Sequence, residues 1–198
     1  METSTDKKVL IVVGPSGVGK DTLMLKLFQK YPNNFQKGVT TTSRPIRPGE
    51  KEGVNYYYVS KEAFLKLKDE NGFVETNFYN NNYYGLSKKE LEKGKTMEKI
   101  MYSIIDINGA YSVHNLKIPA NYIAFLPPSF ESLKQRLLDR GTEKKEVIEG
   151  RINIAKEEIE RIKNTDFFNY KIINDNLEVA FQELDSKIKE LYPNIKSQ

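Results

Sequence analysis

Cysteine is absent from this sequence of 198 residues, which excludes disulfides, thiolate catalysis and zinc sites built on cysteine. There is one histidine, His114, which cannot build a metal cluster by itself and is expected to be a surface or helix-packing residue. Residues 1–8 lack the apolar core of a signal peptide, and no apolar run approaches the length of a membrane span. We therefore expect a cytosolic protein, cytoplasmic in location, without a membrane partner.

A strong charge of one sign is also missing. The net charge is +4, and the basic residues are scattered among acidic ones instead of forming a block. Weak affinity for nucleic acid is one explanation of this charge, and anionic small-molecule substrates explain it equally well. The tyrosine clusters at 56–58 and 79–84 have no interleaved basic stripe, so we expect no nucleic-acid partner.

An apolar run that breaks into a glycine-rich loop is the most informative segment. Residues 9–13 are all apolar, and the seven residues that follow have the spacing Gly-x-x-x-x-Gly-Lys of a P-loop. Such glycines let backbone N–H groups turn towards anionic oxygens, while the lysine and the next helix add positive charge. A glycine-rich turn near a lysine is the alternative, but strand, loop and helix patterns occur here in order. We therefore predict that ATP is bound by Gly14, Ser16, Gly17, Val18, Gly19, Lys20, Asp21 and Thr22.

One position departs from the P-loop pattern. The residue after the lysine is normally Ser or Thr, whose hydroxyl ligates Mg²⁺, whereas this chain has Asp21 followed by Thr22. A carboxylate is a hard ligand for Mg²⁺, although it repels phosphate oxygens when the metal is absent. Alternatively, Asp21 turns outward as a first-turn acid favoured by the helix dipole, and Thr22 or water takes the metal position. We favour a metal-linked Asp21, with Mg²⁺ held mainly by the nucleotide phosphates.

Four strand-like apolar runs alternate with helical patterns. They lie at 9–13, 102–107, 121–126 and 170–173, and this alternation predicts an α/β fold with a parallel sheet covered by helices on both faces. The region 35–95 is different, because it is rich in Tyr, Asn, Gly and Pro, and it is interpreted as an inserted substrate-binding module. The length is that of one folding unit.

Three arginines flank a short connection between two expected helices. Ser129 is expected to cap the first helix, which carries Arg136 and Arg140 on one face, and Arg151 lies on the second helix. Solvated helix charges are the ordinary explanation of such arginines. Beside a P-loop, however, we favour contact with phosphates.

Together these segments resemble guanylate kinase, the P-loop enzyme that phosphorylates GMP from ATP, over nearly the whole chain. The motifs that carry the resemblance are Gly14-Pro15-Ser16-Gly17-Val18-Gly19-Lys20, Thr42-Ser43-Arg44-Pro45-Ile46-Arg47-Pro48-Gly49-Glu50, Tyr83-Tyr84-Gly85, Pro127-Pro128-Ser129 and Arg140-Gly141-Thr142. The resemblance implies one domain over 1–198, with a P-loop NTPase-type core at about 8–34, 96–128 and 165–198. It also implies a GMP-binding insertion at about 35–95 and a helical lid at about 129–164.

The resemblance further implies a GMP site in the insertion. It assigns Arg44, Arg47, Tyr56 and Tyr84 to the GMP phosphate, and arginine forks and phenolic donors do suit a dianionic phosphate. A solvated basic turn is the alternative. The implied contacts to guanosine are Glu75 and Asp106 as acceptors, with Thr40 and Gly85.

Two positions in this part of the chain depart from the family. The family often has a second acid before Asp106, where this chain has Ile104, and a hydroxyl where this chain has Leu86. Ser87 is a candidate to replace that hydroxyl.

Catalysis in this family consists of positioning and charge neutralisation, and it requires no histidine base. The resemblance implies catalytic roles for Lys20, Arg44, Arg136, Arg140 and Arg151, a place near adenine for Asn174, and Mg²⁺ with ATP as cofactor. One alternative is a non-catalytic guanylate-kinase-like domain that binds a phosphorylated peptide, although its usual mark is a damaged P-loop. A second alternative is a P-loop kinase of another small phosphorylated substrate, against which Glu75 and Asp106 argue.

Overall fold

The computed structural model describes residues 7–79, 81–139 and 145–197. Its main element is a parallel sheet of five strands, in which every neighbouring pair is parallel. In spatial order the strands are β2 (Phe35–Lys37), β7 (Ile100–Ile104), β1 (Val9–Val13), β8 (Ala120–Leu126) and β9 (Tyr170–Ile173). All residues of β1 and β8 are buried, as expected for central strands covered on both faces.

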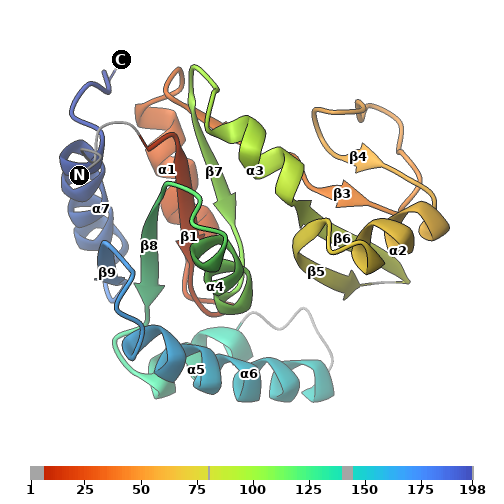
Figure 1. Ribbon diagram of the computed structural model, residues 1–198. Coiled ribbons are helices and arrows are strands. Elements are labelled where there is room, and N and C mark those ends of the chain that lie inside the picture. Colours follow the sequence, from red (N-terminus) through yellow and green to blue (C-terminus); the bar gives the residue numbers. More distant parts are fainter. Residues whose placement is uncertain (1–6, 80, 140–144, 198) are drawn as a thin grey trace.

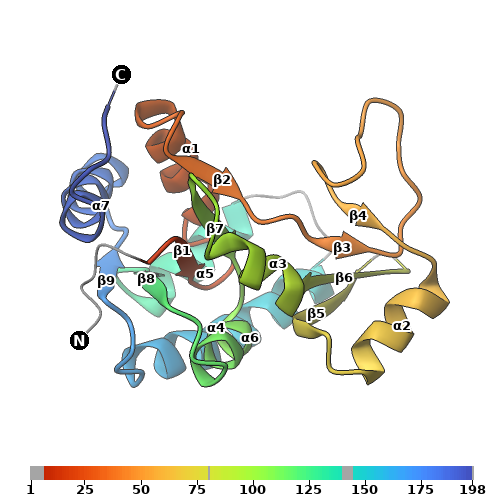
Figure 2. The same ribbon diagram turned by 45° about the horizontal axis from the view of Figure 1, so that its top comes forward.

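Helices cover both faces of this sheet (Figures 1 and 2). Helices α1 (Lys20–Lys30) and α7 (Leu177–Leu191) pack against each other on one face, and α4 (Ile107–Asn115) lies on the other. The predicted α/β architecture is therefore confirmed. Each βα connection leaves the carboxyl end of a parallel strand, so the loops after β1, β7, β8 and β9 meet at one edge, where α/β proteins bind ligands.

A second sheet lies beside the first (right in Figure 1). Its strands, in spatial order, are β4 (Tyr57–Tyr58), β3 (Thr41–Thr42), β6 (Asn82–Ser87) and β5 (Phe73–Tyr79). Helix α2 (Lys61–Asp69) covers it with fully buried Phe64, whose ring stacks on Phe73 at 4.4 Å between centroids. Helix α3 (Lys88–Gly94) then leads to β7.

The boundary between the two sheets differs from the sequence interpretation. Residues 35–37 were predicted to belong to the insertion, but they form β2, the edge strand of the main sheet, paired with β7. The sequence signal was weak because the strand has three residues and only Phe35 is buried. The smaller sheet therefore begins after Lys37.

Helices α5 (Phe130–Asp139) and α6 (Lys145–Lys163) follow β8 and pack against each other. The predicted cap is present, because the Ser129 hydroxyl accepts a hydrogen bond from Ser132 N at 3.0 Å. Leu133 and Leu137 of α5 are buried. Among the helices described, none combines the length and apolar character needed to cross a membrane.

Candidate active site

Two glycines of the loop between β1 and α1 occupy positions that no other residue would fill without strain. Gly17 and Gly19 have φ angles of 84° and 96°, in the left-handed region. A Cβ on Gly19 would lie 2.5 Å from Asn174 Nδ2, and one on Gly17 would lie 2.8 Å from Leu137 Cδ2. Gly19 is also the N-cap of α1, so the loop ends at the positive end of that helix.

Lys20 folds back over this loop. Its ammonium group donates to Gly14 O and, at 3.0 Å, to Pro15 O. Burial lowers the pKa of Lys20, while the nearby charges of Glu158 and Asp21 act in the opposite direction. The loop borders a cavity of about 340 Å³ lined by Ser16, Gly17, Gly19, Lys20, Asp21, Thr22 and Arg136. Six of the eight residues predicted to bind ATP in this segment therefore line one cavity, whereas Gly14 and Val18 do not line it.

A second cavity of about 340 Å³ continues from the same lysine. It is lined by Gly14, Ser16, Lys20, Glu75, Asn77, Ile104, Ile105, Asp106, Arg151, Ile154 and Glu158. Ser16 and Lys20 border both cavities. We call the first the P-loop cavity and the second the carboxylate cavity, because three acidic side chains line it.

Glu75, from β5 of the smaller sheet, contacts Asp106, which follows β7 of the main sheet. Glu75 Oε2 accepts from Asp106 N at 3.4 Å, and burial together with the Asp106 charge raises the pKa of Glu75 to about 7. Asp106 has a second task, because its Oδ1 accepts from Gly109 N at 2.7 Å and caps α4. One Asp106 oxygen is thus occupied by the helix cap.

Glu158 was not singled out by sequence reasoning. It comes from α6, seven residues after Arg151, which places both on one helix face. Burial raises the pKa of Glu158, and the Lys20 charge acts in the opposite direction. The spacing from Arg151 is the signal that could have identified Glu158.

A third cluster, on the smaller sheet, is built around Arg44. Arg44 is 8% exposed, and its guanidinium lies 2.7 Å from Glu50 Oε1 and 5.4 Å from the centre of the Tyr56 ring. The Tyr84 side chain also interacts with this guanidinium, and its ring lies 5.9 Å from that of Tyr56. Arg44, Tyr56 and Tyr84 are therefore close together, as predicted for a phosphate clamp.

Glu50 organises this cluster, and its role was not predicted. Its carboxylate accepts from the Arg44 guanidinium, from Arg47 N at 2.8 Å and from the Tyr58 hydroxyl at 2.8 Å. The hydrogen bond from Arg44 contributes most to lowering the pKa of Glu50, to about 2. Arg47 reaches the cluster through its backbone, and the residue is exposed.

The remaining residues assigned to the base lie along β3 and β6. Thr40 is partly buried directly before β3, and Gly85 pairs with Thr41. A Cβ on Gly85 would lie 2.9 Å from Glu75 O, so this glycine permits the close approach of β5. Ser87, the candidate to replace the missing hydroxyl, uses its side chain to cap α3 by accepting from Glu90 N at 3.1 Å.

The residues assigned to the lid and adenine end have distinct environments. Arg136 donates to Asn174 O at 2.9 Å and to Asp175 O at 3.1 Å, and Arg151 lines the carboxylate cavity. Asn174 is buried directly after β9, where its side chain faces the P-loop. Arg140 lies outside the described residues.

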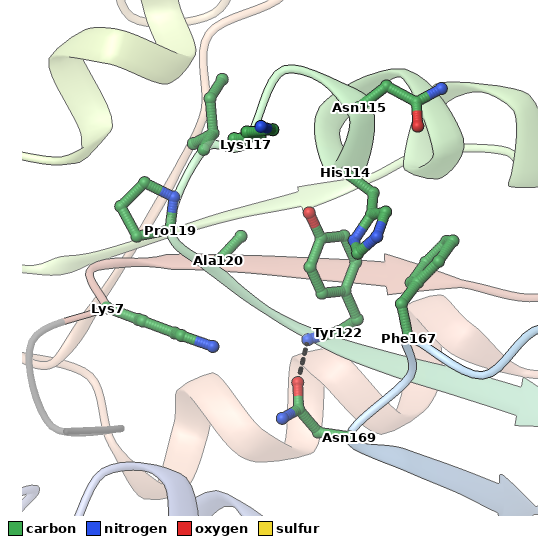
Figure 3. Close-up of a pocket in the computed structure, with 10 residues that line it drawn as sticks. Lys7, His114, Asn115, Lys117, Pro119, Ala120, Tyr122, Phe167 and Asn169 are labelled. Atoms are coloured by element: carbon green, nitrogen blue, oxygen red, sulfur yellow. Dashed lines mark hydrogen bonds between the residues drawn. The ribbon is translucent and has the colours of Figure 1, made fainter. Parts of the chain in front are cut away.

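A larger cavity lies elsewhere, at the opposite edge of the sheet (Figure 3). It has a volume of about 550 Å³, and its walls include Lys7, Lys117 and Tyr122. His114 is exposed and stacks on Phe167 here, with ring centres 4.5 Å apart, as expected for a surface residue that also packs against a neighbour. This cavity contains none of the phosphate-binding motifs.

A glycine-rich loop that joins a central parallel strand to a helix N-terminus defines this chain as a P-loop protein. The guanylate kinase family model matches residues 6–191. The chain is 37% identical to guanylate kinase of Schizosaccharomyces pombe, with 90% of this chain and 89% of the relative covered. It is also 37% identical to guanylate kinase of Lactiplantibacillus plantarum, over 91% of this chain and 86% of the relative.

A solved structure agrees with these sequence relatives. The chain superposes on a crystal structure of guanylate kinase from Anaplasma phagocytophilum with a TM-score of 0.59 and 26% identity, covering 95% of this chain and 87% of the other. The chain belongs to the guanylate kinase family and is a nucleoside monophosphate kinase. These relatives favour the enzyme over the phosphopeptide-binding alternative.

Proposed function

We propose that this protein catalyses the reversible, Mg²⁺-dependent transfer of the ATP γ-phosphate to GMP, giving ADP and GDP. The observation that carries the proposal is the pair of adjoining cavities, which share Ser16 and Lys20. A triphosphate in the P-loop cavity would present its terminal phosphate to a nucleotide in the carboxylate cavity. A lysine at the shared border would then contact the group in transfer.

The P-loop would bind ATP through backbone N–H groups and the N-terminus of α1. Lys20 already donates to Gly14 O and Pro15 O, so its ammonium group lies over the loop, where phosphate oxygens would replace these carbonyls as acceptors. Arg136 borders the same cavity and would add a second positive charge. These groups would stabilise charge on the transferring phosphate.

GMP would be held at both ends. Arg44, Arg47, Tyr56 and Tyr84 would bind its phosphate, and the ionised Glu75 carboxylate would accept from the ring N–H and amino group of guanine. Asp106 would share base recognition through the oxygen that does not cap α4. Thr40 and Gly85 would line the approach along β3 and β6.

In the reaction, a GMP phosphate oxygen forms a bond to the γ-phosphorus while the bond from that phosphorus to the β–γ bridging oxygen breaks. The electron pair of the broken bond stays on ADP. The attacking oxygen is already anionic, so the chain needs no general base. Lys20, Arg44, Arg136, Arg140 and Arg151 would neutralise charge, with the last three supplied by the lid at about 129–164.

The first turn of α1 fits a magnesium ion held mainly by nucleotide. Asp21 and Thr22 line the P-loop cavity, and a carboxylate and a hydroxyl are oxygen donors of the kind Mg²⁺ prefers. In the described part of the chain no three acidic or histidine residues are grouped as a metal site, so phosphates would supply most ligands. When bound, the metal supplies charge neutralisation on the phosphates.

A coupled assay with ATP and each of GMP, AMP, CMP and UMP tests the proposal. We expect ADP formation to require GMP and Mg²⁺, and Lys20→Met to reduce kcat by on the order of 10³. Lys66→Met is the matched control, because its side chain is 78% exposed on α2. Phosphopeptide binding without ADP formation would establish the non-catalytic alternative, and equal turnover of another monophosphate would establish a different kinase.

A further inference from the structure

The buried side chain of Asn174 contacts the P-loop directly. Asn174 follows β9, is 5% exposed, and donates from Nδ2 to Val18 O at 2.8 Å across 156 residues of sequence. The family resemblance implied a place near adenine for this residue. The contact with Val18 shows instead that the side-chain amide binds the backbone of the P-loop.

The contact fixes the direction of one peptide group. The peptide bond between Val18 and Gly19 is trans and planar, so its C=O and N–H point in opposite directions. Since the carbonyl points to Asn174, the Gly19 N–H points away from Asn174. Gly19 lines the P-loop cavity and Asn174 does not, so this N–H is directed to the side where phosphate oxygens would lie.

Asn174 is itself held from two sides. The backbone N–H of Asn174 donates to Leu126 O at 2.8 Å, and its backbone carbonyl accepts from the Arg136 guanidinium at 2.9 Å. Its amide nitrogen packs so closely on Gly19 that a Cβ there would lie 2.5 Å away. A side chain fixed at these points has little freedom to leave the Val18 carbonyl.

We propose that Asn174 is a positioning residue that aims the Gly19 N–H at the phosphates of the bound nucleotide by holding the Val18 carbonyl. The proposal rests on the proposed phosphate-binding role of the P-loop. The side chain at this position must be a donor, such as an amide, because its partner, the Val18 carbonyl, is an acceptor. An aspartate of the same shape would place a second acceptor against the carbonyl and turn the peptide away.

Binding of inorganic tripolyphosphate with Mg²⁺ separates this role from a contact with adenine, because this probe has phosphates and no base. Calorimetry should show that Asn174→Asp weakens tripolyphosphate and ATP by the same factor, about tenfold or more. Asn176→Asp is the matched control, since it makes the same change two residues later. Its side chain caps α7 by accepting from Glu178 N and Val179 N, which aspartate also does, so both affinities should stay within about twofold.

Weaker ATP binding with unchanged tripolyphosphate binding would overturn the proposal and assign Asn174 to adenine. If Asn174→Asp does not fold, Asn174→Ala serves the same comparison, with a loss of about fivefold for both ligands and a folded state verified by thermal unfolding. Unchanged affinity of a folded Asn174→Ala for both ligands would also overturn it. Wild-type protein that binds tripolyphosphate but does not phosphorylate GMP would refute the proposed function alone.

Discussion

Ionisation of Glu75 should destabilise the folded protein and, over the same pH range, make the enzyme selective for GMP. Its carboxyl lies between the two sheets, against Asp106 N and close to Gly109, and burial raises its pKa to about 7. Guanine recognition by acceptors needs the ionised form, which is the form that burial disfavours. Glu75→Gln removes this ionisation while it keeps the size of the side chain.

The direction and size of the effect on the unfolding free energy follow from the pKa values of Glu75 in the folded and unfolded chain. The ordinary pKa of a glutamate is 4.5, so between pH 4.5 and 7 the folded protein binds a proton at Glu75 that the unfolded chain has released. Stability therefore falls as pH rises through this window, by roughly 3 kcal/mol in total. Glu75→Gln should then exceed wild type in unfolding free energy by up to about 3 kcal/mol at pH 8, and by much less at pH 4.5.

Urea unfolding of wild type and Glu75→Gln at pH 4.5 and pH 8 measures this effect. Effects of the substitution that do not depend on pH cancel when the stability differences at the two pH values are subtracted. In the enzyme assay, the wild-type kcat/KM for GMP should fall about tenfold per pH unit below 7, and the variant should lose this dependence. The GMP phosphate also titrates near pH 6, but it does so for both proteins. Equal stability gain at pH 4.5 and 8, or an unchanged ratio of kcat/KM for GMP and AMP, would refute this role for Glu75.

Two further substitutions test other parts of the site. Asp21→Ser should remain active, bind metal-free ATP more tightly and depend less steeply on Mg²⁺, because it removes a negative charge beside the phosphates. The ATP affinities of wild type and variant, measured with Mg²⁺ and with chelator, test this. If the two proteins have identical affinities in both conditions, Asp21 does not face the metal. Arg44→Lys should raise KM for GMP by about tenfold or more while KM for ATP changes little, because an ammonium group lacks the planar fork that can bind Glu50 and a phosphate together. Steady-state kinetics with each substrate varied measures both KM values. An equal rise in the two values would contradict the prediction.

The parts of the fold that sequence could predict are those with a continuous local pattern. The run at 9–13, the glycine spacing after it and the helix from Lys20 are adjacent in the chain, so the P-loop was predicted with its correct boundaries. Strand β2 was assigned to the insertion because three residues with one buried side chain carry almost no periodicity. Its place is decided by pairing with β7, whose residues lie 65 positions later in the chain than their partners in β2.

The site was predictable where the family resemblance assigns a role to a residue. Arg44, Tyr56 and Tyr84 were assigned through the family resemblance, and the structure brings them together. Glu50 and Glu158 were missed because their roles arise from contacts between elements, and an acidic residue on a loop or helix is ordinarily a solvated charge. The contact of Asn174 with Val18 likewise depends on the order of β1, β8 and β9 in the sheet.

The charges of the carboxylate cavity explain why the two nucleotides should influence each other. Glu75, Asp106 and Glu158 share this cavity with Lys20 and Arg151, so acids outnumber bases before any phosphate arrives. A triphosphate on the other side of Lys20 would add further negative charge, which would favour protonation of Glu75 and Glu158, whose pKa values burial already raises. In the proposed function, the metal ion and the lid arginines would therefore do more than stabilise the transferring phosphate. By offsetting the charge of ATP, they would keep Glu75 in the ionised form that guanine recognition needs.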